Sequence, residues 1–386
     1  MNSSAPTIAL VAGETSGDQL GAALVEKLRE RYPNAHFVGI AGDKMQAAGV
    51  EAWWHADELA VMGLYDVLSH LRRLLRLRKE LLQKLLDLKP DVLIGIDAPD
   101  FNLGLEIKAR RAGIRTVHYV SPTVWAWREK RVRKIARAAD LVLCLFPFEP
   151  RFYADHDVAA SYVGHPLADQ IDPDRDPQAA RARLGLDTGS TTVSLLPGSR
   201  HSEVSRLAEP MIESARLLQA KHPGIQFVAA MAKQSVEEEF RSEMQRLGFS
   251  AIKLVRGDPR AVIAAGDSVI CASGTATLEV MLVNRPMVMT YRLSPSTYRL
   301  GKLLNLVKLR WFSLPNILAN EALVPELIQD DATAENLASA TARWLDDEPG
   351  VEALRSRFLQ LHESLRCGAG DKAAGAVARL LEAAKR

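Results

Sequence analysis

The stretch Thr7-Ile-Ala-Leu-Val-Ala-Gly-Glu-Thr-Ser-Gly-Asp18 decides the fold of this chain. It starts with an apolar run, which predicts a strand over residues 7–12, and it turns through two glycines. It continues into residues 18–31, whose leucines recur at helical spacing. An apolar strand that passes through a glycine turn into an amphipathic helix is the repeating part of a βαβ unit. Such units build a parallel sheet with helices on both faces. The stretch therefore predicts an α/β fold.

The same alternation continues along both halves of the chain. In the first half we predict strands at residues 36–40, 92–96, 116–120 and 141–145, with helices over 71–88 and 105–112. In the second half we predict strands at residues 192–196, 226–231, 251–255, 268–272 and 287–291, with helices opening near Ser202, Asp258, Gly274 and Thr333. The polar, proline-containing residues 169–177 separate the two runs. We expect two Rossmann-like domains, 1–168 and 169–345, followed by C-terminal helices over 346–386. The sequence allows these helices to pack on either domain.

Composition limits the classes of protein that fit. A chain of 386 residues exceeds what one core usually serves, and 47% hydrophobic with 25% charged residues is ordinary for a globular protein. A net charge of +2 without a recognisable nucleic-acid module argues against a nucleic-acid partner. Three widely spaced cysteines, and an N-terminus without the features of a signal peptide, predict a reduced, cytoplasmic setting. The chain contains no uninterrupted apolar run long enough for a transmembrane helix.

The glycine turn after the first strand has two interpretations. It is either a plain strand-to-helix turn with Ser16 or Asp18 as the helix cap, or a site where polar groups contact sugar hydroxyls. The second interpretation assigns sugar or acceptor binding to Glu14, Ser16, Gly17 and Asp18. A nicotinamide cofactor is disfavoured, because the G-x-G-x-x-G pattern is absent and Glu14 would repel a pyrophosphate.

A second strand end carries the string Asp97-Ala-Pro-Asp-Phe-Asn102. Because an unpaired carboxylate is costly to bury, Asp97 at the end of a central strand favours a functional role. We expect it to be the general base that takes a proton from an acceptor hydroxyl. Asp100 is either the cap of a helix that starts at Asn102 or Leu103, or an acceptor contact together with Asn102.

Two histidines allow both a functional and a structural interpretation. His118 lies in another predicted strand, near its carboxyl end, where it either contacts the acceptor or satisfies a hydrogen bond in the core. His165 precedes the polar segment, either as a cleft residue or as a structural turn residue.

Two turns in the second half are of the type that binds phosphate. In Leu196-Pro-Gly-Ser-Arg200, the backbone of Gly198 and Ser199 and the guanidinium of Arg200 suit a diphosphate, although a plain turn with an exposed arginine is the alternative.

The other such turn is Ala272-Ser-Gly-Thr-Ala-Thr-Leu-Glu279. Ser273, Gly274 and Thr275 suit phosphate oxygens at a helix start, and Glu279, four residues beyond Thr275, suits a ribose diol. The alternative is an unremarkable first helical turn. Two such turns in one half predict that the second domain binds a nucleotide.

Metal chemistry has little support in the sequence. The chain lacks His-x-x-x-His, Cys-x-x-Cys and Asp-x-Asp patterns, so we expect no metal and no other cofactor. We then expect Arg200 and helix N-termini to stabilise the negative charge on the leaving group.

An apolar segment beside a basic, leucine-rich one suggests contact with anionic lipid headgroups. The residues expected at the membrane are Val61, Met62, Leu64, Arg72, Arg73 and Arg76. An ordinary surface helix with a solvated basic face is the alternative.

Six strings in their order resemble the lipid-A-disaccharide synthase family over almost the whole chain. They are Ala12-Gly-Glu-Thr-Ser-Gly-Asp18, Gly95-Ile-Asp-Ala-Pro-Asp-Phe-Asn102, His118-Tyr-Val-Ser-Pro-Thr-Val-Trp-Ala-Trp127, Leu196-Pro-Gly-Ser-Arg200, Ala272-Ser-Gly-Thr-Ala-Thr-Leu-Glu279 and Ser313-Leu-Pro-Asn316. The resemblance implies a GT-B glycosyltransferase fold with its active site in the interdomain cleft. It also implies transfer of diacylglucosamine from its UDP donor to the 6-hydroxyl of diacylglucosamine 1-phosphate, with inversion at C1.

The resemblance further implies roles for single residues: Asp97 is the base, Arg200 a diphosphate ligand, Glu279 the ribose acid and Asn316 a donor-site residue. It implies an enzyme on the inner face of the inner membrane, and it leaves a homodimer open. Two alternatives remain. One is another UDP-sugar enzyme of this architecture, either a UDP-N-acetylglucosamine transferase acting on a lipid or an epimerase. The other is a non-catalytic lipid- or nucleotide-binding protein.

Overall fold

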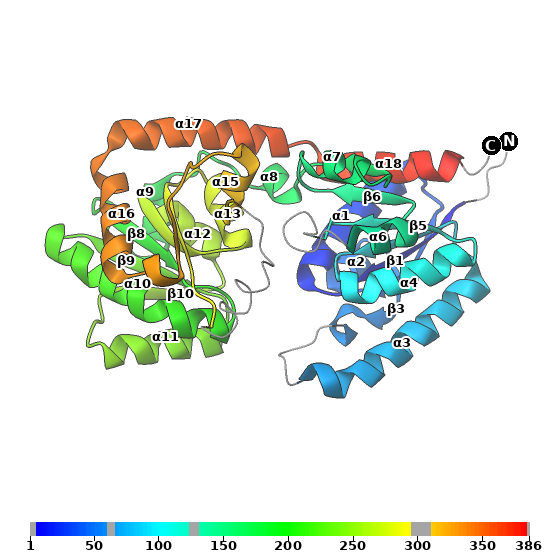
Figure 1. Cartoon of the computed structure of the whole chain (residues 1–386), viewed down its shortest axis with the longest axis horizontal. Helices are drawn as coiled ribbons and strands as arrows, with labels where there is room; N and C mark the ends of the chain where they lie inside the picture. Colours follow the sequence, from blue (N-terminus) through cyan, green and yellow to red (C-terminus); the bar gives the residue numbers. More distant parts are fainter. Residues whose placement is uncertain (1–4, 60–65, 123–130, 295–309, 384–386) are drawn as a thin grey trace. The chain divides into compact units, whose positions relative to one another are not determined.

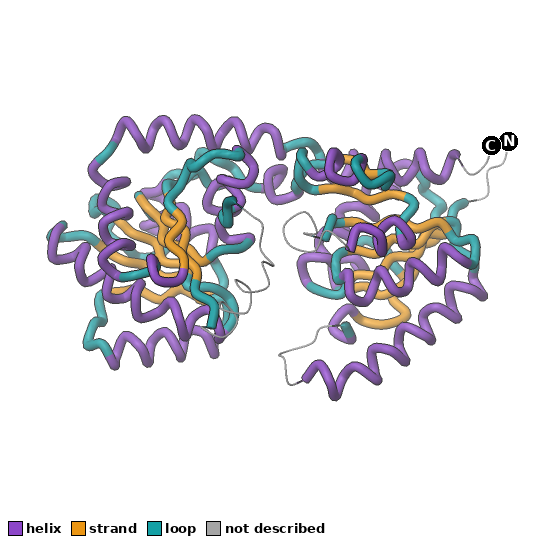
Figure 2. The backbone as a smooth tube through the Cα atoms, in the orientation of Figure 1, coloured by secondary structure: helices purple, strands orange, loops and turns teal. Residues whose placement is uncertain are grey.

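The structure is a computed structural model that describes residues 5–59, 66–122, 131–294 and 310–383. The chain divides into two compact units. Unit 1 consists of Met1–Asp169 and Leu365–Arg386, and unit 2 of Gln170–Ser364. In each unit the strands form a central layer with helices on both sides (Figure 2).

Unit 1 contains a seven-stranded parallel sheet in the order β3-β2-β1-β4-β5-β6-β7. Its strands are β1 (Thr7–Ala12), β2 (His36–Ala41), β3 (Glu51–His55), β4 (Val92–Ile96), β5 (Arg115–Tyr119), β6 (Leu141–Cys144) and β7 (Ala160–Tyr162). The chain first builds outward from β1 through β2 and β3, then returns to place β4 on the other side of β1. The ends of β1 and β4 therefore flank the topological switch point, where open parallel sheets bind their ligands.

The helices of unit 1 cover both faces of this sheet (Figure 1). They are α1 (Thr15–Arg31), α2 (Asp43–Ala47), α3 (Asp66–Leu88), α4 (Pro99–Arg111), α6 (Val132–Ala138), α7 (Glu149–Ala154), α8 (Pro166–Gln170) and α18 (Ala369–Ala383). Side chains alternate along β1, so Leu10 packs with α1 and α18 while Val11 packs with α3 and α4. This double burial explains why the strand is apolar at every position.

Unit 2 repeats the plan with six strands in the order β10-β9-β8-β11-β12-β13. Its strands are β8 (Thr192–Leu196), β9 (Gln226–Met231), β10 (Ile252–Arg256), β11 (Ser268–Ala272), β12 (Met287–Tyr291) and β13 (Glu326–Ile328). Its helices are α9 (Pro177–Arg183), α10 (His201–Lys221), α11 (Gln234–Arg246), α12 (Pro259–Ala265), α13 (Thr275–Leu282), α15 (Leu314–Ala319), α16 (Ala334–Asp346) and α17 (Glu348–Leu365). Here the switch point lies between β8 and β11.

The predicted fold class, two Rossmann-like α/β units, is confirmed. We predicted the C-terminal helices over 346–386 as one segment. The structure divides them, because α17 belongs to unit 2 and α18 to unit 1. Two interactions bind α18 to unit 1. The Asp169 carboxylate accepts hydrogen bonds from the amides of Gly368 and Ala369 at 2.9 and 2.7 Å, and the alanine-rich face of the helix is buried against α1.

Candidate functional site

The two turns at the switch point of unit 1 lie against each other. A Cβ placed on Gly13, which follows β1, would lie only 3.1 Å from the Cβ of Ala98, which follows β4. Glycine at this position therefore allows the two turns to approach closely. The polar residues that we singled out after both strands thus share one edge of the sheet.

The backbone at this edge is strained at residues that are not glycine. Asp97 and Ala98 have φ angles of 51° and 42°, and Val120, at the end of the neighbouring β5, has a φ of 79°. Such left-handed conformations are uncommon for residues with a side chain, and for a β-branched valine they are genuine outliers. Strain of this kind concentrates at functional sites. It supports the functional interpretation of Asp97, whose side chain is half-buried.

The side chain of Asn102 holds the left-handed backbone conformation of Asp97. Its side chain is fully buried, and its Nδ2 donates to the backbone oxygen of Asp97 at 2.9 Å and to that of Val11 at 3.3 Å. The amide thus ties the ends of β4 and β1 together. The structure gives Asn102 the role of a positioning residue, in place of the acceptor contact that we predicted.

A buried acid–histidine pair lies next to this amide. Nδ1 of His118 is 2.8 Å from Oε1 of Glu106, and neither side chain is exposed. A Cβ at Gly95 of β4 would overlap the Glu106 carboxylate, so the glycine makes room for it. Burial raises the pKa of Glu106, and His118 opposes that shift. His118 therefore makes a hydrogen bond in the core, as the structural alternative predicted.

The sequence analysis missed Glu106. The available signal was its spacing of four residues from Asn102, which places both side chains on the face of α4 that packs on the sheet, opposite a glycine in the strand. Polar residues on a sheet-facing helix stripe need partners, and a strand glycine supplies the space for them.

The turn after β1 combines structural and exposed residues. Asp18 is 5% exposed, and its carboxylate accepts hydrogen bonds from three amides at the start of α2, those of Gly42, Lys44 and Met45, at 2.9–3.1 Å. It is therefore a structural cap, and neither predicted interpretation gave it this role. Gly17 is buried against Ala12 and Ile96.

Neither Ser16 nor Asp18 caps α1. That helix begins at Thr15 after Glu14, and Glu14 makes no side-chain capping bond. Glu14 and Ser16 are exposed, so both remain candidates for ligand contact.

Asp100 does not cap α4. The helix begins at Pro99 with Ala98 in the capping position, so the capping alternative was wrong. The exposed carboxylate of Asp100 forms an ion pair with Arg131 instead.

In unit 2 the two phosphate-type turns meet in one pocket of about 600 Å³. They are adjacent because β8 and β11 are paired, with Leu196 opposite Cys271. The predicted residues that line the pocket are Gly198, Ser199, Arg200, Ser273, Gly274, Thr275 and Glu279. The pocket is completed by residues that the sequence analysis missed, among them Glu203, Met231, Gly257, Pro259 and Ile263.

The first of these turns is closed by a carboxylate. Oε2 of Glu203 accepts from the amides of Ser199 and Arg200 at 3.0 and 3.3 Å, and its Oε1 lies 3.0 Å from Nη1 of Arg200. Gly198 has a φ of 114°, and a Cβ there would lie 2.5 Å from Glu203. The turn therefore offers a ligand the exposed Arg200 guanidinium, because Glu203 already occupies the two amides.

The second turn is open. Gly274 precedes α13 with a φ of 129°, a conformation suited to glycine, and a Cβ there would meet open space. The amides of Thr275 and Ala276 start the helix, so they have no carbonyl partner within it. A helix N-terminus of this kind attracts phosphate.

Glu279 lies one turn further along α13. Burial raises the pKa of this carboxyl, and Arg260 of α12 opposes the shift from a distance of 3.5 Å. Arg260 thereby favours the ionised form, which accepts hydrogen bonds from a diol.

Asn316 has its side-chain amide occupied within unit 2. It is fully buried, donates to Val324 O and Glu326 Oε1 at 3.0 and 2.9 Å, and accepts from the amides of Leu323 and Val324. It is not among the residues that line the pocket. The structure therefore assigns it to holding the segment before β13.

Comparison with known proteins shows the family. The profile of the lipid-A-disaccharide synthetase family matches residues 8–377. A lipid-A-disaccharide synthase of Xanthomonas campestris pv. campestris is 52% identical over 379 residues, which cover 98% of this chain and 86% of the relative. One of Xylella fastidiosa is 49% identical over 380 residues, which cover 98% of this chain and 99% of the relative. The chain belongs to the lipid-A-disaccharide synthase family. It is a glycosyltransferase of lipid A biosynthesis, and these relatives come from Gram-negative bacteria.

Solved structures share the fold of this family member. A UDP-GlcNAc 2-epimerase from Neisseria meningitidis bound to UDP-GlcNAc has a TM-score of 0.64 at 12% identity, over 97% of this chain and all of that one. A glycosyltransferase from Rickettsia africae has a TM-score of 0.60 at 9% identity, over the whole of both chains. These neighbours show the GT-B fold. Family membership decides against the epimerase alternative.

Three further features were considered in the sequence: metal ligands, cysteines and membrane-spanning helices. Among the described residues, no group of His, Cys, Asp and Glu side chains could hold a metal ion. The three cysteines are free thiols. Within the same described residues, no helix is both long and apolar enough to cross a membrane.

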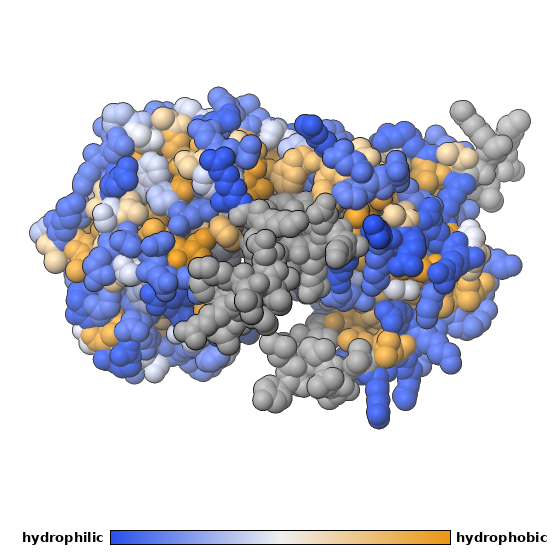
Figure 3. Space-filling model, in the orientation of Figure 1, coloured by the Kyte–Doolittle hydropathy of each residue, from blue (hydrophilic) through white to orange (hydrophobic). Residues whose placement is uncertain are grey.

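The residues predicted to contact a membrane fall into three groups. Val61, Met62 and Leu64 lie outside the described residues. Arg72 and Arg76 are exposed on α3. Arg73 forms an ion pair with Glu58, so part of its charge is already neutralised. Hydrophilic side chains project from the α3 side of unit 1 in the space-filling view (Figure 3).

Proposed function

We propose that this enzyme joins UDP-2,3-diacylglucosamine to 2,3-diacylglucosamine 1-phosphate and releases UDP. The product is the β-1,6-linked disaccharide 1-phosphate, formed with inversion at C1. Membership of the lipid-A-disaccharide synthase family supports the substrates. The observation that carries the chemistry is the strained Asp97 turn at one switch point, together with an open helix N-terminus in a 600 Å³ pocket at the other.

The proposed step needs one base and no covalent intermediate. The Asp97 carboxylate takes the proton of the acceptor 6-hydroxyl while O6 forms a bond to C1 of the donor sugar. The bond between C1 and the diphosphate oxygen breaks, and UDP leaves with the electron pair. Arg200 and the amides that open α13 stabilise the charge on the diphosphate. The Glu279 carboxylate binds the ribose diol.

Metal independence is part of this proposal. The guanidinium of Arg200 and the α13 N-terminus supply positive charge on the diphosphate side, which is the task a divalent ion performs in other enzymes. We expect turnover to be unchanged after treatment with EDTA and dialysis. Loss of turnover that added Mg²⁺ restores would contradict this expectation.

The substrate pair is tested with purified protein. UDP-diacylglucosamine and diacylglucosamine 1-phosphate in mixed micelles should give a disaccharide 1-phosphate and one UDP per bond, measured by mass spectrometry. UDP-N-acetylglucosamine serves as the competing substrate, both with a lipid acceptor and alone for epimerisation. Turnover of that sugar without disaccharide formation from the acylated pair would reject the proposal.

We also propose that unit 1 contacts the anionic inner face of the inner membrane, at the cytoplasmic side, through α3. The exposed Arg72 and Arg76 and a leucine at position 75 that is 46% exposed support this. Replacing Arg72, Arg73 and Arg76 by serine should weaken binding to vesicles with anionic lipid, most clearly at low salt. Unchanged binding would leave α3 an ordinary surface helix.

A further inference from the structure

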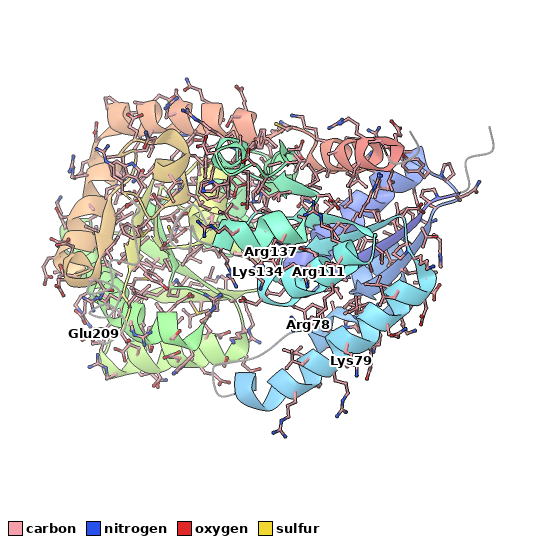
Figure 4. The ribbon with its side chains drawn as sticks, turned by 45° about the vertical axis from the view of Figure 1, so that its right-hand side comes forward. Arg78, Lys79, Arg111, Lys134, Arg137 and Glu209 are labelled. Atoms are coloured by element: carbon pink, nitrogen blue, oxygen red, sulfur yellow. The ribbon has the colours of Figure 1, made fainter. Side chains whose placement is uncertain are left out.

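Four cationic side chains converge on α4 in unit 1. Arg78 comes from α3, Arg131 stands at the N-cap of α6, and Lys134 and Arg137 lie within α6. Figure 4 shows Lys134 and Arg137 close together, with Arg78 of α3 below them. We call Arg78, Arg131, Lys134 and Arg137 the α4 cation cluster. Both α3, which carries Arg78, and α6, which carries or is capped by the other three, contact α4.

The packing of Arg78 indicates how the cluster is built. Its guanidinium lies 6.0 Å from the centre of the Phe101 ring, in cation–π geometry. A Cβ on Gly104 of α4 would lie 2.6 Å from Nη1 of Arg78. The glycine therefore gives the arginine room to lie across α4, where the aromatic ring holds its orientation.

The charge of this cluster is poorly compensated. Burial lowers the pKa of Lys134, and Arg131, Arg78 and Arg137 lower it further. Glu106 acts in the opposite direction but is fully buried below. Among the described residues, the only ion pair made by the cluster is that of Arg131 with Asp100. Gathering cations in this way costs free energy that a bound anion offsets.

We propose that the α4 cation cluster binds the phosphate monoester of the acceptor sugar. The inference rests on the proposed function for the identity of that acceptor. Arginine forks and a lysine ammonium are the groups that bind phosphate in proteins. A dianionic phosphate monoester is a better match for several clustered cations than a carboxylate or a neutral sugar.

The position of the cluster fits an acceptor held by Asp97. The cluster contacts Asp100 and Phe101, which belong to the same turn as Asp97. Asp100 is three residues from Asp97, so their Cα atoms lie at most about 11 Å apart, and the cluster borders the segment that carries the candidate base. The sugar then presents its 6-hydroxyl to Asp97 while the ring places the 1-phosphate at the cluster.

The test compares two ligands on one variant. In the double variant Arg78→Gln with Lys134→Gln, we expect binding of a water-soluble, short-chain diacylglucosamine 1-phosphate to weaken by about 10–100-fold, the usual worth of lost charge-assisted hydrogen bonds. Binding of the same compound without its phosphate should not change. Calorimetry measures both, and a wild-type circular dichroism spectrum and thermal unfolding curve show that unit 1 of the variant, which carries both substitutions, is folded.

A matched control uses neighbouring cations. Lys79 and Arg111 lie near the cluster in Figure 4 but are not among the groups that shift the pKa of Lys134. The double variant Lys79→Gln with Arg111→Gln should bind the phosphorylated compound as the wild type does. An equal loss in both double variants, an equal loss for both compounds, or no loss at all would each overturn the proposal.

A second arm separates the acceptor from lipid headgroups, which also carry phosphate. Vesicles containing phosphatidylglycerol should bind the cluster variant and the wild type alike. If vesicle binding falls while acceptor binding is kept, the cluster serves the membrane, and the proposal is overturned. Because calorimetry requires no turnover, phosphate-dependent binding at the cluster would support the proposal even if the enzyme formed no disaccharide, in which case the proposed function alone would fail.

Discussion

The two units have the same strand order around their switch points but different chemistry there. At the switch point of unit 1 the strand ends carry a carboxylate, Asp97, over a buried network of Asn102, Glu106 and His118. At the switch point of unit 2 they carry glycine turns, an exposed arginine and an open helix N-terminus. The topology fixes where a ligand binds, and the residue types at the strand ends fix what each unit does with it.

The two sites also differ in which residue types adopt left-handed backbone conformations. The left-handed residues at the site of unit 1 are Asp97, Ala98 and Val120, each of which costs about 1–3 kcal/mol in such a conformation. The left-handed residues in the pocket turns of unit 2 include Gly198 and Gly274, for which this conformation costs little. Unit 1 thus stores strain to hold one carboxylate in place. In unit 2, Gly198 makes room for Glu203, and Gly274 leaves the backbone open to a ligand.

Removing the candidate base should have the largest effect, because it should lower turnover without changing UDP affinity. We expect Asp97→Asn to lower turnover by about 10²–10⁴-fold, because an amide cannot accept the proton of the acceptor hydroxyl. UDP affinity should stay at the wild-type value, because we propose that the nucleotide binds in unit 2. Steady-state kinetics and calorimetry with UDP measure the two effects.

Asp87→Asn is the control for Asp97→Asn, since Asp87 is an exposed acid of unit 1 at the end of α3. Its turnover should match the wild type. Wild-type turnover in Asp97→Asn would remove Asp97 from the mechanism, and a matching loss of UDP affinity would remove the division of labour between the units.

The complementary change lies in unit 2. Glu279→Gln should weaken UDP binding by about 10-fold or more, because a charged acceptor for the ribose diol is lost. The same substitution should hardly change binding of 2′-deoxy-UDP, which lacks one of the two hydroxyls. Calorimetry with both nucleotides gives the two affinities.

Glu238→Gln on the exposed face of α11 is the matched control, and UDP and its deoxy analogue should bind it as they bind the wild type. If Glu279→Gln weakened both nucleotides equally, the carboxylate would act on the pocket in general, and its assignment to the ribose would be wrong.

The long elements of both sheets could be predicted from the sequence. β1, β4, β8, β9, β11 and β12 have the predicted bounds. They are central or next to central in their sheets and apolar at nearly every position, which is the clearest strand signal. The short strands β3, β7 and β13 were missed. They lie at sheet edges, where half-buried positions leave a mixed pattern.

The site was predictable to the level of turns, not of single contacts. Strand ends identify the turns, and the pocket of unit 2 collects both of those that we predicted. The sequence could not distinguish a side chain that faces a ligand from one that binds the protein's own backbone. Asp18, Asn102 and Asn316 are polar residues that we predicted at the sites, but they lie in helices and cap or tie other segments. That difference depends on tertiary partners such as the amide of Gly42.

A buried histidine should make unit 1 sensitive to acid. Burial lowers the pKa of His165 to about 4, below its ordinary value of 6.5, and Asp169 only partly opposes this. Below pH 6.5 the unfolded chain binds a proton that the folded chain excludes, so the free energy of unfolding falls as the pH falls. The loss should be about 2 kcal/mol at pH 5. Urea unfolding at pH 5 and pH 7.5 measures it.

The variant His165→Asn should lack this dependence, because asparagine does not titrate but can still accept the hydrogen bond from the amide of Leu167. His201→Asn, at an exposed site in unit 2, should keep the pH dependence of the wild type. An identical pH dependence in wild type and His165→Asn would show that another group dominates acid unfolding.

The smallest expected effect concerns the surface of α3. Each exposed arginine near an anionic membrane contributes about 1 kcal/mol, so Arg72→Ser or Arg76→Ser should weaken vesicle binding by about 5-fold. Arg73→Ser should weaken it less, because Arg73 is already paired with Glu58. Co-sedimentation with anionic vesicles at low salt measures the order, and Arg241→Ser in unit 2 should leave binding unchanged. If all four variants behaved alike, lipid contact would not be specific to α3, and the contrast between the units would end at their switch points.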